Sequence, residues 1–383
     1  MKYLVLGAGM MGSAVAYDLA KASSSDQVIL ADINEDLARR VARETGPNVS
    51  GVALDVHDHD AVMKLLRSVA AVVSAVSYSV NEELTRLAIE AGVHFCDLGG
   101  NNDVVDRQLA MDGAAYAKGI TVLPNCGLAP GLINILAVSG MQTFDAVESI
   151  ELRVGGLPQH PRPPLNYEIV FSAEGLLNEY LEPAEVIQDG KIRTVESLTG
   201  VESLTFAPPF GTMEAFHTSG GISTLTRELE GKVRTLDYKT IRYPGHCEKF
   251  KMLLDLGFAG GEPVMVGNSV RTTREFFTEL LKRKLSTGDH DLVLARATLK
   301  GKKAGRNRTL VYECVDYYDE ATRMTSMMRT TAFPTSISAK MLAEGAISRR
   351  GVMPPEQCIP GDAMIVELAK RGVRITTEVN ETP

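Results

Sequence analysis

Three closely spaced glycines near the first residue constrain the fold of this sequence more than any other feature. They stand in the segment Gly7-Ala8-Gly9-Met10-Met11-Gly12, directly after the apolar residues 3–6 and at the start of an amphipathic stretch. In a turn from a strand into a helix, the first glycine permits the turn, the second lets a ligand approach the backbone, and the third lets helix and strand pack closely. Free N–H groups at the start of such a helix attract an anion. The segment, including Met10 and Met11, therefore predicts a phosphate-binding turn.

The surrounding residues 1–126 alternate short apolar runs with longer amphipathic stretches. Strands are predicted at residues 3–6, 28–31, 49–54, 71–75, 94–96 and 121–123, and helices at residues 10–20, 35–44, 60–67, 81–91 and 103–118. Such alternation is typical of β-α-β units and a parallel sheet. The pattern matches a doubly wound sheet, so this region is predicted to be a Rossmann dinucleotide-binding domain.

An acidic residue at the end of the second predicted strand bears on the expected cofactor. Asp32 lies about 20 residues after the last glycine, where a carboxylate accepts hydrogen bonds from the adenosine ribose. It would repel a 2′-phosphate, and Arg39 and Arg40 stand farther along the next helix. We therefore expect NAD rather than NADP. Asp32 can also cap the helix that starts near Asn34, and both roles are compatible.

Residues that follow the next strands should border the same site, because doubly wound sheets bind ligands beyond the carboxyl ends of their strands. Asp55 is expected either to line the adenine pocket or to cap a loop. The residues after the fourth strand are expected near the nicotinamide ribose, and they are Ser74, Ala75, Val76 and Tyr78.

The fifth and sixth predicted strands lead into Asp97 and into Asn125-Cys126-Gly127. Asp97 either takes part in proton transfer or forms a turn before Leu98. We expect Cys126 to be a packing residue, because no basic neighbour in the sequence would make it a thiolate.

Beyond Pro130 the sequence becomes richer in Gly, Pro and Thr, and β-branched residues alternate at 292–299 and 309–315 around a turn at 301–305. These features predict a second α+β domain on a largely antiparallel sheet with helices on one face, spanning residues 127–336, which we expect to bind the substrate. A helix is expected at 337–347 and a strand at 373–379. We expect residues 337–383 to return to the first domain.

Composition narrows the expected partners to a small molecule. A formal net charge of -8 and an isoelectric point near 5.5 argue against nucleic acid. The five cysteines lack the C-x-x-C spacing of a metal site and suit a reducing cytoplasm, so no metal is expected. The first residues run straight into the glycine segment, and no apolar stretch approaches the ~20 residues of a membrane-spanning helix.

Several later motifs resemble those of one family. They are Asp97-Leu98-Gly99-Gly100, Pro124-Asn125-Cys126-Gly127-Leu128-Ala129-Pro130-Gly131, Glu214-Ala215-Phe216-His217-Thr218-Ser219-Gly220-Gly221, Tyr238-Lys239-Thr240-Ile241-Arg242-Tyr243-Pro244-Gly245-His246, Arg349-Arg350-Gly351-Val352 and Pro354-Pro355-Glu356. Together with the glycine segment they resemble the saccharopine dehydrogenase superfamily over nearly the whole chain, and most of all bacterial L-lysine 6-dehydrogenases. Asn125-Cys126 departs from the pattern, which would have an acidic and an aliphatic residue there.

The resemblance implies NAD-dependent oxidative deamination of the L-lysine side chain, by a homo-oligomer whose two domains close over the substrate. The product would be allysine, which cyclises to 1-piperideine-6-carboxylate, with release of ammonia. Saccharopine reductases have a larger substrate domain, so this shorter chain favours the smaller amino acid. The alternatives are imine reduction of the saccharopine or carboxynorspermidine type, and a non-catalytic NAD-bound regulator.

The chemistry of amine oxidation indicates candidate residues. A lysine side chain, with an ordinary pKa of about 10.4, is protonated near neutrality and has no lone pair to assist hydride loss. The candidate bases are His246, His217, Asp97 and Tyr78, and His246 is favoured because it ends the Arg242 strand and begins a predicted helix. Arg242 offers a two-pronged donor for the substrate α-carboxylate, although it could instead form a structural ion pair. Tyr78 and Thr218, the latter beside a glycine-rich loop, are also expected to contact the substrate.

Overall fold

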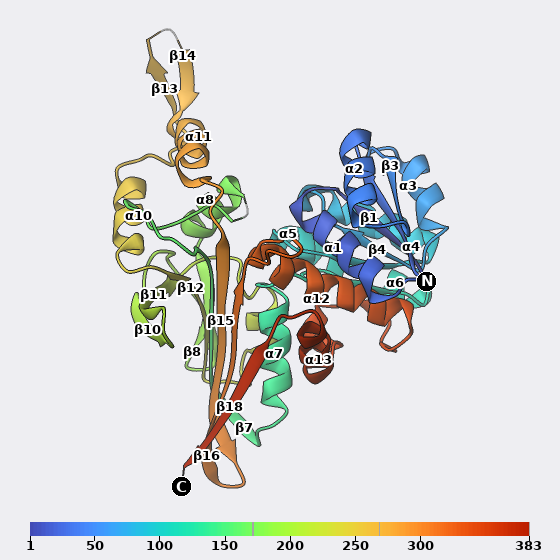
Figure 1. Cartoon of the computed structure of the whole chain (residues 1–383). Helices are drawn as coiled ribbons and strands as arrows, with labels where there is room; N and C mark the ends of the chain where they lie inside the picture. The colour runs from blue at the N-terminus through green and yellow to red at the C-terminus, as the bar shows by residue number, and fades with distance from the viewer. Residues whose placement is uncertain (171, 268, 383) are drawn as a thin grey trace. The chain divides into compact units, whose positions relative to one another are not determined.

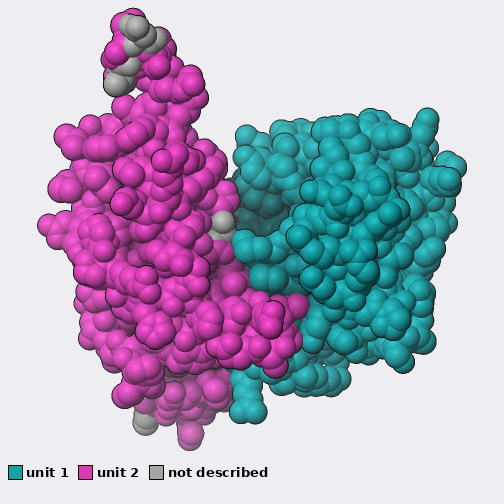
Figure 2. All heavy atoms as spheres, turned by 45° about the horizontal axis from the view of Figure 1, so that its top comes forward, with its two compact units in different colours: residues 1–143, 222–225, 328–374 teal, residues 144–221, 226–327, 375–383 magenta. Residues whose placement is uncertain are grey.

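The computed structural model describes residues 1–170, 172–267 and 269–382, and it contains two compact units (Figure 2). Unit 1 comprises Met1–Thr143, Ile222–Leu225 and Met328–Arg374. Unit 2 comprises Phe144–Gly221, Thr226–Met327 and the described residues from Ile375 onward. The chain therefore passes between the units more than once.

Unit 1 is a parallel sheet with helices around it (Figure 1). Its strands are β1 (Lys2–Leu6), β2 (Gln27–Asp32), β3 (Val49–Ala53), β4 (Ala71–Ser74), β5 (His94–Asp97), β6 (Thr121–Leu123) and β17 (Gly351–Val352). Its helices are α1 (Met10–Ala22), α2 (Glu35–Thr45), α3 (His59–Leu66), η1 (Tyr78–Val80), α4 (Asn81–Ala91), α5 (Asn102–Leu109), α6 (Asp112–Ala117), α7 (Leu132–Met141), η2 (Pro355–Gln357) and α13 (Gly361–Lys370), with most of α12 (Ser326–Ala343).

The strand order β17-β6-β5-β4-β1-β2-β3 confirms the predicted doubly wound sheet. All of these pairings are parallel, and β1 lies between β2 and β4. The strands are almost wholly apolar because helices cover both faces of such a sheet, and Leu4, Val72 and Phe95 are fully buried. The sequence order of the strands changes direction in the sheet at β1. Because β1 pairs in parallel with β4, the carboxyl ends of these two strands lie side by side.

The predicted helix at residues 103–118 is two helices. α5 ends at Leu109 and α6 begins at Asp112, whose Oδ1 accepts the N–H of Val352 at 2.9 Å. Asp112 thus anchors β17, the strand that returns from the far end of the sequence to extend the sheet next to β6. Helical periodicity alone does not reveal this break, and the contact of Asp112 with Val352 joins residues far apart in the sequence.

Unit 2 is built on a mixed, mainly antiparallel sheet in the order β10-β11-β12-β7-β15-β16-β18, with β8 and β9 attached to β12. The strands are β7 (Ala146–Pro158), β8 (Ala184–Gln188), β9 (Lys191–Val195), β10 (Glu202–Phe206), β11 (Gly211–His217), β12 (Thr235–Arg242), β15 (Asp291–Lys303), β16 (Arg306–Tyr317) and β18 (Ile375–Thr382). The helices are α8 (Ala173–Leu181), α9 (Leu225–Leu229), α10 (His246–Asp255) and α11 (Thr273–Leu285), and β13 (Pro263–Val266) pairs with β14 (Ser269–Thr272) beside α11 (Figure 1).

The two long strands β15 and β16 form the hairpin expected around residues 301–305. Ala304 and Gly305 both have positive φ angles, of 50° and 78°, as a two-residue hairpin turn requires. β7 pairs antiparallel with β15 and parallel with β12. The expected α+β organisation with a largely antiparallel sheet is confirmed.

The last part of the chain differs from the expectation in two respects. β18 pairs with β16, from Asn307↔Thr382 to Cys314↔Ile375, so the residues beyond Arg374 lie in the second sheet and do not return to the first domain. α12 begins at Ser326 rather than near residue 337. The carboxylate of Asp291 accepts the N–H groups of Ser326 and Met327, at 2.6 and 2.8 Å, and so caps the helix at its first residues. The hydrophobic periodicity of the sequence does not predict this early start. Among the described residues, no helix is long and apolar enough to cross a membrane.

Candidate functional site: a glycine turn and a buried arginine cluster

The glycine turn in unit 1 has the geometry that its spacing predicts. Gly7 has a φ of +96°, and a Cβ there would lie 2.7 Å from the carbonyl oxygen of Ala75. A Cβ on Gly12 would lie 1.8 Å from the carbonyl oxygen of Gly7, so neither position has room for a side chain. A Cβ on Gly9 would meet no described atom within 4 Å. The backbone is therefore open to a ligand at Gly9 and closed by packing at the other two glycines.

The start of α1 is free to receive an anion. Its N-cap, Gly9, supplies no side-chain hydrogen bond, and the first turn contains no acidic residue. Met10 and Met11 begin the helix, with Met10 51% exposed. Unpartnered N–H groups and the positive end of the helix dipole make this the part of unit 1 best suited to a phosphate.

Asp32 holds the glycine turn from the end of β2. Its Oδ2 accepts the N–H of Ala8 at 2.7 Å, and its Oδ1 accepts the N–H of Asn34 at 2.8 Å. Asn34 itself caps α2, because its side chain accepts the N–H of Leu37 at 3.0 Å. The structure thus gives the capping role to Asn34 and leaves a partly exposed carboxylate next to the phosphate turn.

The residues after β4 lie beside Gly7. The N–H of Ala75 bonds to the carbonyl of Leu6 at 2.8 Å, and a Cβ on Gly7 would be 3.2 Å from the side chain of Val76. Ser74 is buried and donates to Asn81 at 2.7 Å, so its hydroxyl serves packing rather than a ligand.

Asp55 and Tyr78 lie at the periphery of this edge. Asp55 is exposed and accepts the N–H of His57 at 2.9 Å, which is the geometry of a local turn. Tyr78 is 38% exposed, and its ring lies against Gly100. Of the two, only Tyr78 is in contact with the glycines that follow Asp97.

Asp97 is fully buried, and both of its carboxylate oxygens are engaged. They accept the N–H groups of Gly99 and Asn125 at 2.7 and 3.2 Å, and the side-chain amide of Gln108 at 2.7 Å. Burial raises the pKa of Asp97, while these hydrogen bonds oppose the shift. The geometry assigns Asp97 to joining β5, β6 and α5 and leaves it no free oxygen for proton transfer.

The Asn125-Cys126 segment, where the sequence departs from the family pattern, is structural as well. Asn125 has a φ of 64° and donates to the hydroxyl of Ser223 at 3.0 Å, which in turn donates to Asn102 at 2.7 Å. Cys126 is buried, and burial raises its pKa well above the usual range. A neutral packed thiol is what the sequence predicted there.

In unit 2, Arg242 at the end of β12 is nearly inaccessible, with 3% exposure. Its Nε donates to the hydroxyl of Tyr180 at 2.9 Å, Nη1 donates to the carbonyl of Ile241 at 2.9 Å, and the guanidinium lies 4.6 Å from the centre of the Tyr167 ring. No ion pair joins it to a carboxylate among the described residues. Because a buried charge without a counter-charge is costly, this cation calls for an anion.

A directed series of hydrogen bonds continues from Arg242 to His246. The Tyr180 hydroxyl accepts from Arg242, so it donates to Nε2 of His246, at 3.1 Å, and Nδ1 of His246 donates to the carbonyl of Leu165 at 2.9 Å. Burial lowers the pKa of His246 to about 3, and the positive charge of Arg242 adds to this. His246 therefore lies beside Arg242, as expected, but it is neutral with both nitrogens engaged, so its geometry is that of a positioning residue.

His217 lies on the opposite face of the same sheet. The register of β11 and β12 places it opposite Lys239, whereas side chains alternate along β12 and Arg242 points the other way. Its Nδ1 is 3.4 Å from the carbonyl of Tyr238, and burial lowers its pKa. Thr218, the next residue, bonds to Thr240 at 2.9 Å on the Arg242 face. The structure thus brings Thr218 near the arginine cluster and separates His217 from it.

Glu179, the residue before Tyr180 in α8, is a candidate that the sequence does not indicate. It is partly buried, and its carboxylate forms no hydrogen bond or ion pair with the residues that the structure describes. Burial raises the pKa of Glu179 to about 7; Arg242 opposes this shift and the charge of Glu182 adds to it. No motif marks this glutamate in the sequence, because the charge of Arg242 that acts on it comes from a distant part of the chain.

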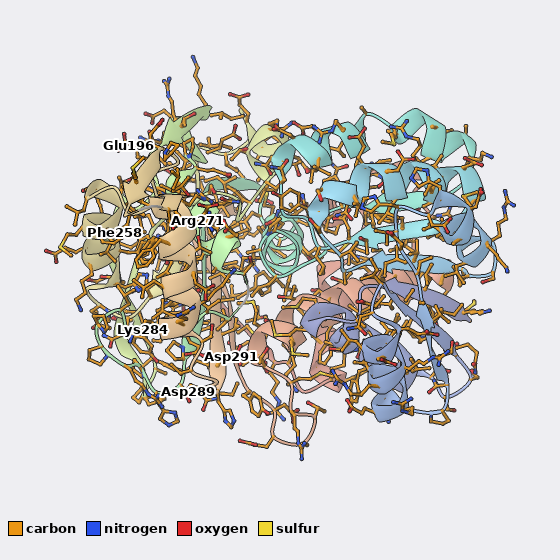
Figure 3. All side chains as sticks on the ribbon, turned by 90° about the horizontal axis from the view of Figure 1, so that it is seen from above. Glu196, Phe258, Arg271, Lys284, Asp289 and Asp291 are labelled. Atoms are coloured by element: carbon orange, nitrogen blue, oxygen red, sulfur yellow. The ribbon has the colours of Figure 1, made fainter. Side chains whose placement is uncertain are left out.

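Two hollows are found on unit 2, and the first adjoins the arginine cluster, because Tyr167 lines it. A cavity of about 670 Å³ has an apolar wall that includes Tyr167, Leu253 and Phe277, and Figure 3 labels three more of its residues, Phe258, Lys284 and Asp289.

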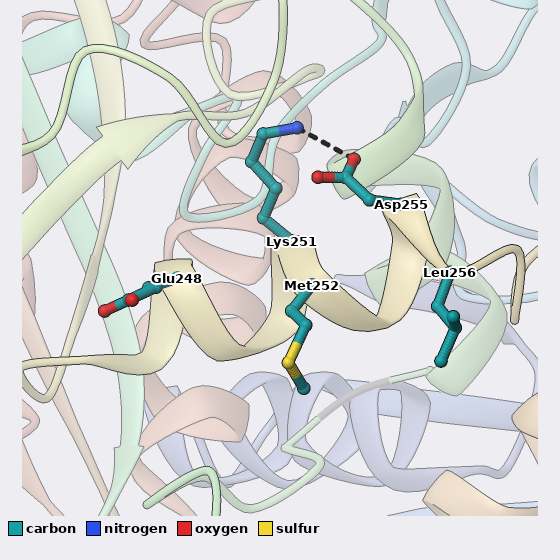
Figure 4. Close-up of a pocket in the computed structure, with 5 residues that line it drawn as sticks. All are labelled: Glu248, Lys251, Met252, Asp255 and Leu256. Carbon is teal, nitrogen blue, oxygen red and sulfur yellow. Dashed lines mark hydrogen bonds and ion pairs between the residues drawn. The ribbon is translucent and has the colours of Figure 1, made fainter.

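A shallower hollow lies on the exposed face of α10, around Met252, Leu256 and the Lys251–Asp255 ion pair of 2.9 Å (Figure 4). It is open surface with no convergent buried polar group. No metal-binding group of three or more His, Cys, Asp or Glu residues occurs in the described part of the chain.

Comparison with known proteins assigns the glycine turn and the arginine cluster to two different family domains. Residues 3–123 match the family model described as the saccharopine dehydrogenase NADP binding domain, and residues 127–373 match the saccharopine dehydrogenase C-terminal domain. The two matches together cover both the glycine turn and the Arg242 cluster.

Individual relatives are distant. The chain is 24% identical to the mitochondrial alpha-aminoadipic semialdehyde synthase of Mus musculus, over 92% of this chain but only 45% of that protein. It is 21% identical to the carboxyaminopropylagmatine dehydrogenase of a Synechocystis species, over 97% of this chain and 96% of that protein. The solved structure of saccharopine dehydrogenase (L-Glu forming) from Saccharomyces cerevisiae shares the fold, with a TM-score of 0.82, 21% identity and 99% coverage of both chains.

Proposed function

The chain belongs to the saccharopine dehydrogenase family, and from that premise we propose that it oxidatively deaminates the side-chain amine of L-lysine. The product would be allysine, which cyclises to 1-piperideine-6-carboxylate, and ammonia would be released. The observation that carries the proposal is a buried Arg242 with no carboxylate partner among the described residues. Its missing counter-charge matches the α-carboxylate of an amino acid.

The glycine turn would hold the pyrophosphate of NAD, with Asp32 beside the adenosine ribose. When bound, the nicotinamide ring supplies the hydride acceptor for the carbon that bears the amine. Ala75 and Val76, next to Gly7, would border its ribose. Because Asp32 brings negative charge to this place, NAD is proposed in preference to NADP, although the matching family domain is described as NADP-binding.

Arg242 would hold the α-carboxylate, which is the end of lysine remote from the reacting amine. Tyr180 orients the guanidinium by accepting a hydrogen bond from Nε, and His246 orients Tyr180 by accepting a hydrogen bond from its hydroxyl. Burial raises the pKa of Tyr180, so its hydroxyl stays neutral and keeps this direction of donation. We therefore propose His246 as a positioning residue.

The second candidate function is the reduction of an imine to a secondary amine, as in saccharopine formation. It is favoured by the relatives, since one is a semialdehyde synthase and another, matched over nearly its full length, is a carboxyaminopropylagmatine dehydrogenase. The Arg242 cluster would bind the carboxylate of such substrates equally well, so the chemistry of the reacting end must separate the two functions.

A substrate panel tests the proposal. L-lysine, saccharopine and diamines would each be incubated with NAD and with NADP, and both reduced nicotinamide and ammonium would be measured. We expect L-lysine with NAD to give equal amounts of the two products. Saccharopine oxidation without ammonium, combined with inactivity toward L-lysine, would replace the proposal with the imine-reductase alternative.

A further inference from the structure

Unit 2 holds two oppositely charged side chains that have no ion-pair partner among the described residues. Arg242 is one, and Glu179 on α8 is the other. They are neighbours in the fold, because the residue after Glu179 is Tyr180, whose hydroxyl accepts from Arg242. The charge of Arg242 lowers the pKa of Glu179 and the charge of Glu179 raises that of Arg242, yet no ion pair joins the two side chains.

The end of α8 is held firmly, so this placement is well defined. The carbonyl of Glu179 accepts the N–H of Ser219 at 3.0 Å. The side chain of Asn178 accepts from Arg274 of α11 at 2.6 Å, and Arg274 also pairs with Glu174 at 3.3 Å. These contacts hold α8 against the loop after β11 and against α11, and none of them uses the Glu179 carboxylate.

Among the described residues, Arg242 is the cation that acts on the pKa of Glu179 and has no ion-pair partner of its own. β12 contributes Arg242 and Tyr238 to the electrostatic environment of Glu179, and Tyr167, Tyr180 and Glu182 complete that environment. On α11, Arg274 is already paired, and on α10 the nearby His246 is neutral. Tyr167 and Tyr238 have raised pKa values because of burial and stay uncharged near neutrality.

We propose that Glu179 and Arg242 form a subsite for the charged end of a free α-amino acid, with Arg242 binding its carboxylate and Glu179 its α-ammonium group. The proposal deepens, and rests on, the proposed function. In an α-amino acid the two charges are attached to the same carbon atom, so a ligand of this class supplies both missing counter-charges at once. Neither an amine without a carboxylate nor an acid without an α-amine would do so.

Position decides between this role and a role as general base. The reacting amine of lysine lies at the far end of its side chain from the carboxylate that Arg242 binds. A carboxylate beside Arg242 therefore reaches the α-ammonium rather than the amine that is oxidised. Loss of Glu179 should consequently weaken binding and raise KM, with little effect on kcat.

Ionisation adds a pH signature. The raised pKa of Glu179, about 7, means that its carboxyl is only partly ionised near neutrality in the free protein. An ammonium ion binds the ionised form, so affinity should rise as pH increases through 7 and fall by about tenfold for each unit below it. The α-ammonium of the ligand stays charged in this range, which leaves Glu179 as the group that titrates.

The experiment is calorimetric titration of the full chain with L-lysine and with 6-aminohexanoate, which is lysine without its α-amine. The wild-type protein should bind L-lysine about 10- to 100-fold more tightly than 6-aminohexanoate at pH 7.5, the range for a hydrogen bond to a charged group. Glu179→Gln should bind both ligands with similar affinity, and the affinity for L-lysine should lose its dependence on pH between 6 and 7.5. Glu179→Asp, which keeps the charge, should restore part of the preference.

Glu279→Gln, an exposed change on the neighbouring helix α11, is the control and should leave the preference intact. An unchanged preference in Glu179→Gln would overturn the subsite while leaving the proposed function standing. The same would follow if Glu179→Gln lowered kcat by 100-fold at constant KM, since Glu179 would then transfer protons. If neither ligand bound and L-lysine were not oxidised, the proposed function itself would fall.

Discussion

The glycine turn of unit 1 and the arginine cluster of unit 2 use opposite means of recognition. The turn presents backbone N–H groups and empty space at Gly9, so its affinity depends on the absence of side chains. The cluster presents buried charge at Arg242, supported by Tyr180 and His246, so its affinity depends on particular side-chain atoms. A backbone site should therefore fail when an atom is added, and a side-chain site when an atom is removed.

Adding one methyl group to the turn should have the largest effect. Gly12→Ala would place a Cβ 1.8 Å from the carbonyl oxygen of Gly7, so α1 must move away from β1. We expect NAD affinity to fall by about 100-fold and the melting temperature to drop, because overpacking of this kind costs about 1–3 kcal/mol or more. Cofactor titration and thermal unfolding measure the two effects.

Gly9→Ala is the matched control, because a Cβ there meets no described atom within 4 Å and its backbone is in an ordinary extended conformation. This variant should fold with unchanged stability. Its NAD affinity should fall nonetheless if the open space in front of Gly9 receives the pyrophosphate. Equal stability losses in both variants would contradict the distinction between packing and ligand space.

The sequence predicted the turn because local backbone geometry requires particular residues. Gly7, Gly12 and Asp32 stand at positions that any strand–turn–helix unit of this kind fixes, and the six strands of residues 1–126 follow from the same alternation. The sequence does not predict helix boundaries that involve contacts between residues far apart in the chain. The break before Asp112 and the early start of α12 at Ser326 both depend on partners far away in the sequence.

In unit 2 the sequence indicates Arg242 and His246 but not the side chains that surround them. Proximity in the sequence brought His246 near Arg242, yet only the structure reveals that Tyr180 stands between them and occupies its nitrogen. His217 is predicted to lie with them, because the sequence alone does not show which face of the sheet a residue at the end of a strand occupies. The register of β11 against β12 places it on the other face. Glu179 escaped notice because its environment is created entirely by packing.

Removing the two-pronged donor should affect substrate binding next most strongly. Arg242→Lys keeps the charge but loses the Nε contact to Tyr180 and the planar geometry that matches a carboxylate. We expect KM for the amino acid to rise by about 100-fold with NAD affinity unchanged. Steady-state kinetics at several cofactor concentrations would separate the two parameters.

Arg153→Lys provides the contrast on the opposite face of the sheet. Arg153 is buried too, but it pairs with Glu202 and Asp237 and so already has its counter-charges. The change should lower stability and leave KM within about twofold, since it touches no free charge. If Arg153→Lys raised KM strongly and Arg242→Lys did not, the substrate carboxylate would bind on the Arg153 face of the sheet, and the site proposed at Arg242 would be wrong.

A smaller effect is expected at His246, because it acts through Tyr180. His246→Asn should raise KM by up to about tenfold, the equivalent of one hydrogen bond, and should change kcat by less than threefold. A 100-fold fall in kcat at constant KM would instead identify His246 as the general base. Kinetics at pH values from 6 to 9 would distinguish these results.

The stability of the protein toward acid tests the same residue independently. The pKa of His246 is lowered to about 3 in the folded protein, below its ordinary value of 6.5, so the unfolded chain takes up a proton first as pH falls. Stability present above pH 6.5 should therefore be lost progressively between pH 6.5 and 3. His246→Asn removes this contribution, and the slope of melting temperature against pH should become shallower than in the wild type. His217→Asn should change that slope less, since His217 is less fully buried.

The smallest change concerns Asp32, whose carboxylate accepts a backbone N–H of the glycine turn. Asp32→Asn keeps an oxygen that can accept from Ala8 or Asn34, so the turn should survive, but it removes the negative charge beside the adenosine ribose. NAD loses a charged acceptor and NADP loses a repulsion, so the ratio of their kcat/KM values should shift toward NADP by about tenfold.

Arg39 should contribute little to this shift, because it pairs with Glu35 at 2.5 Å on the exposed face of α2, and Arg39→Gln should leave the ratio nearly unchanged. Kinetics with both cofactors would decide. A wild-type protein that uses both equally, or that prefers NADP, would contradict the role given to Asp32 and would agree with the name of the family's NADP binding domain.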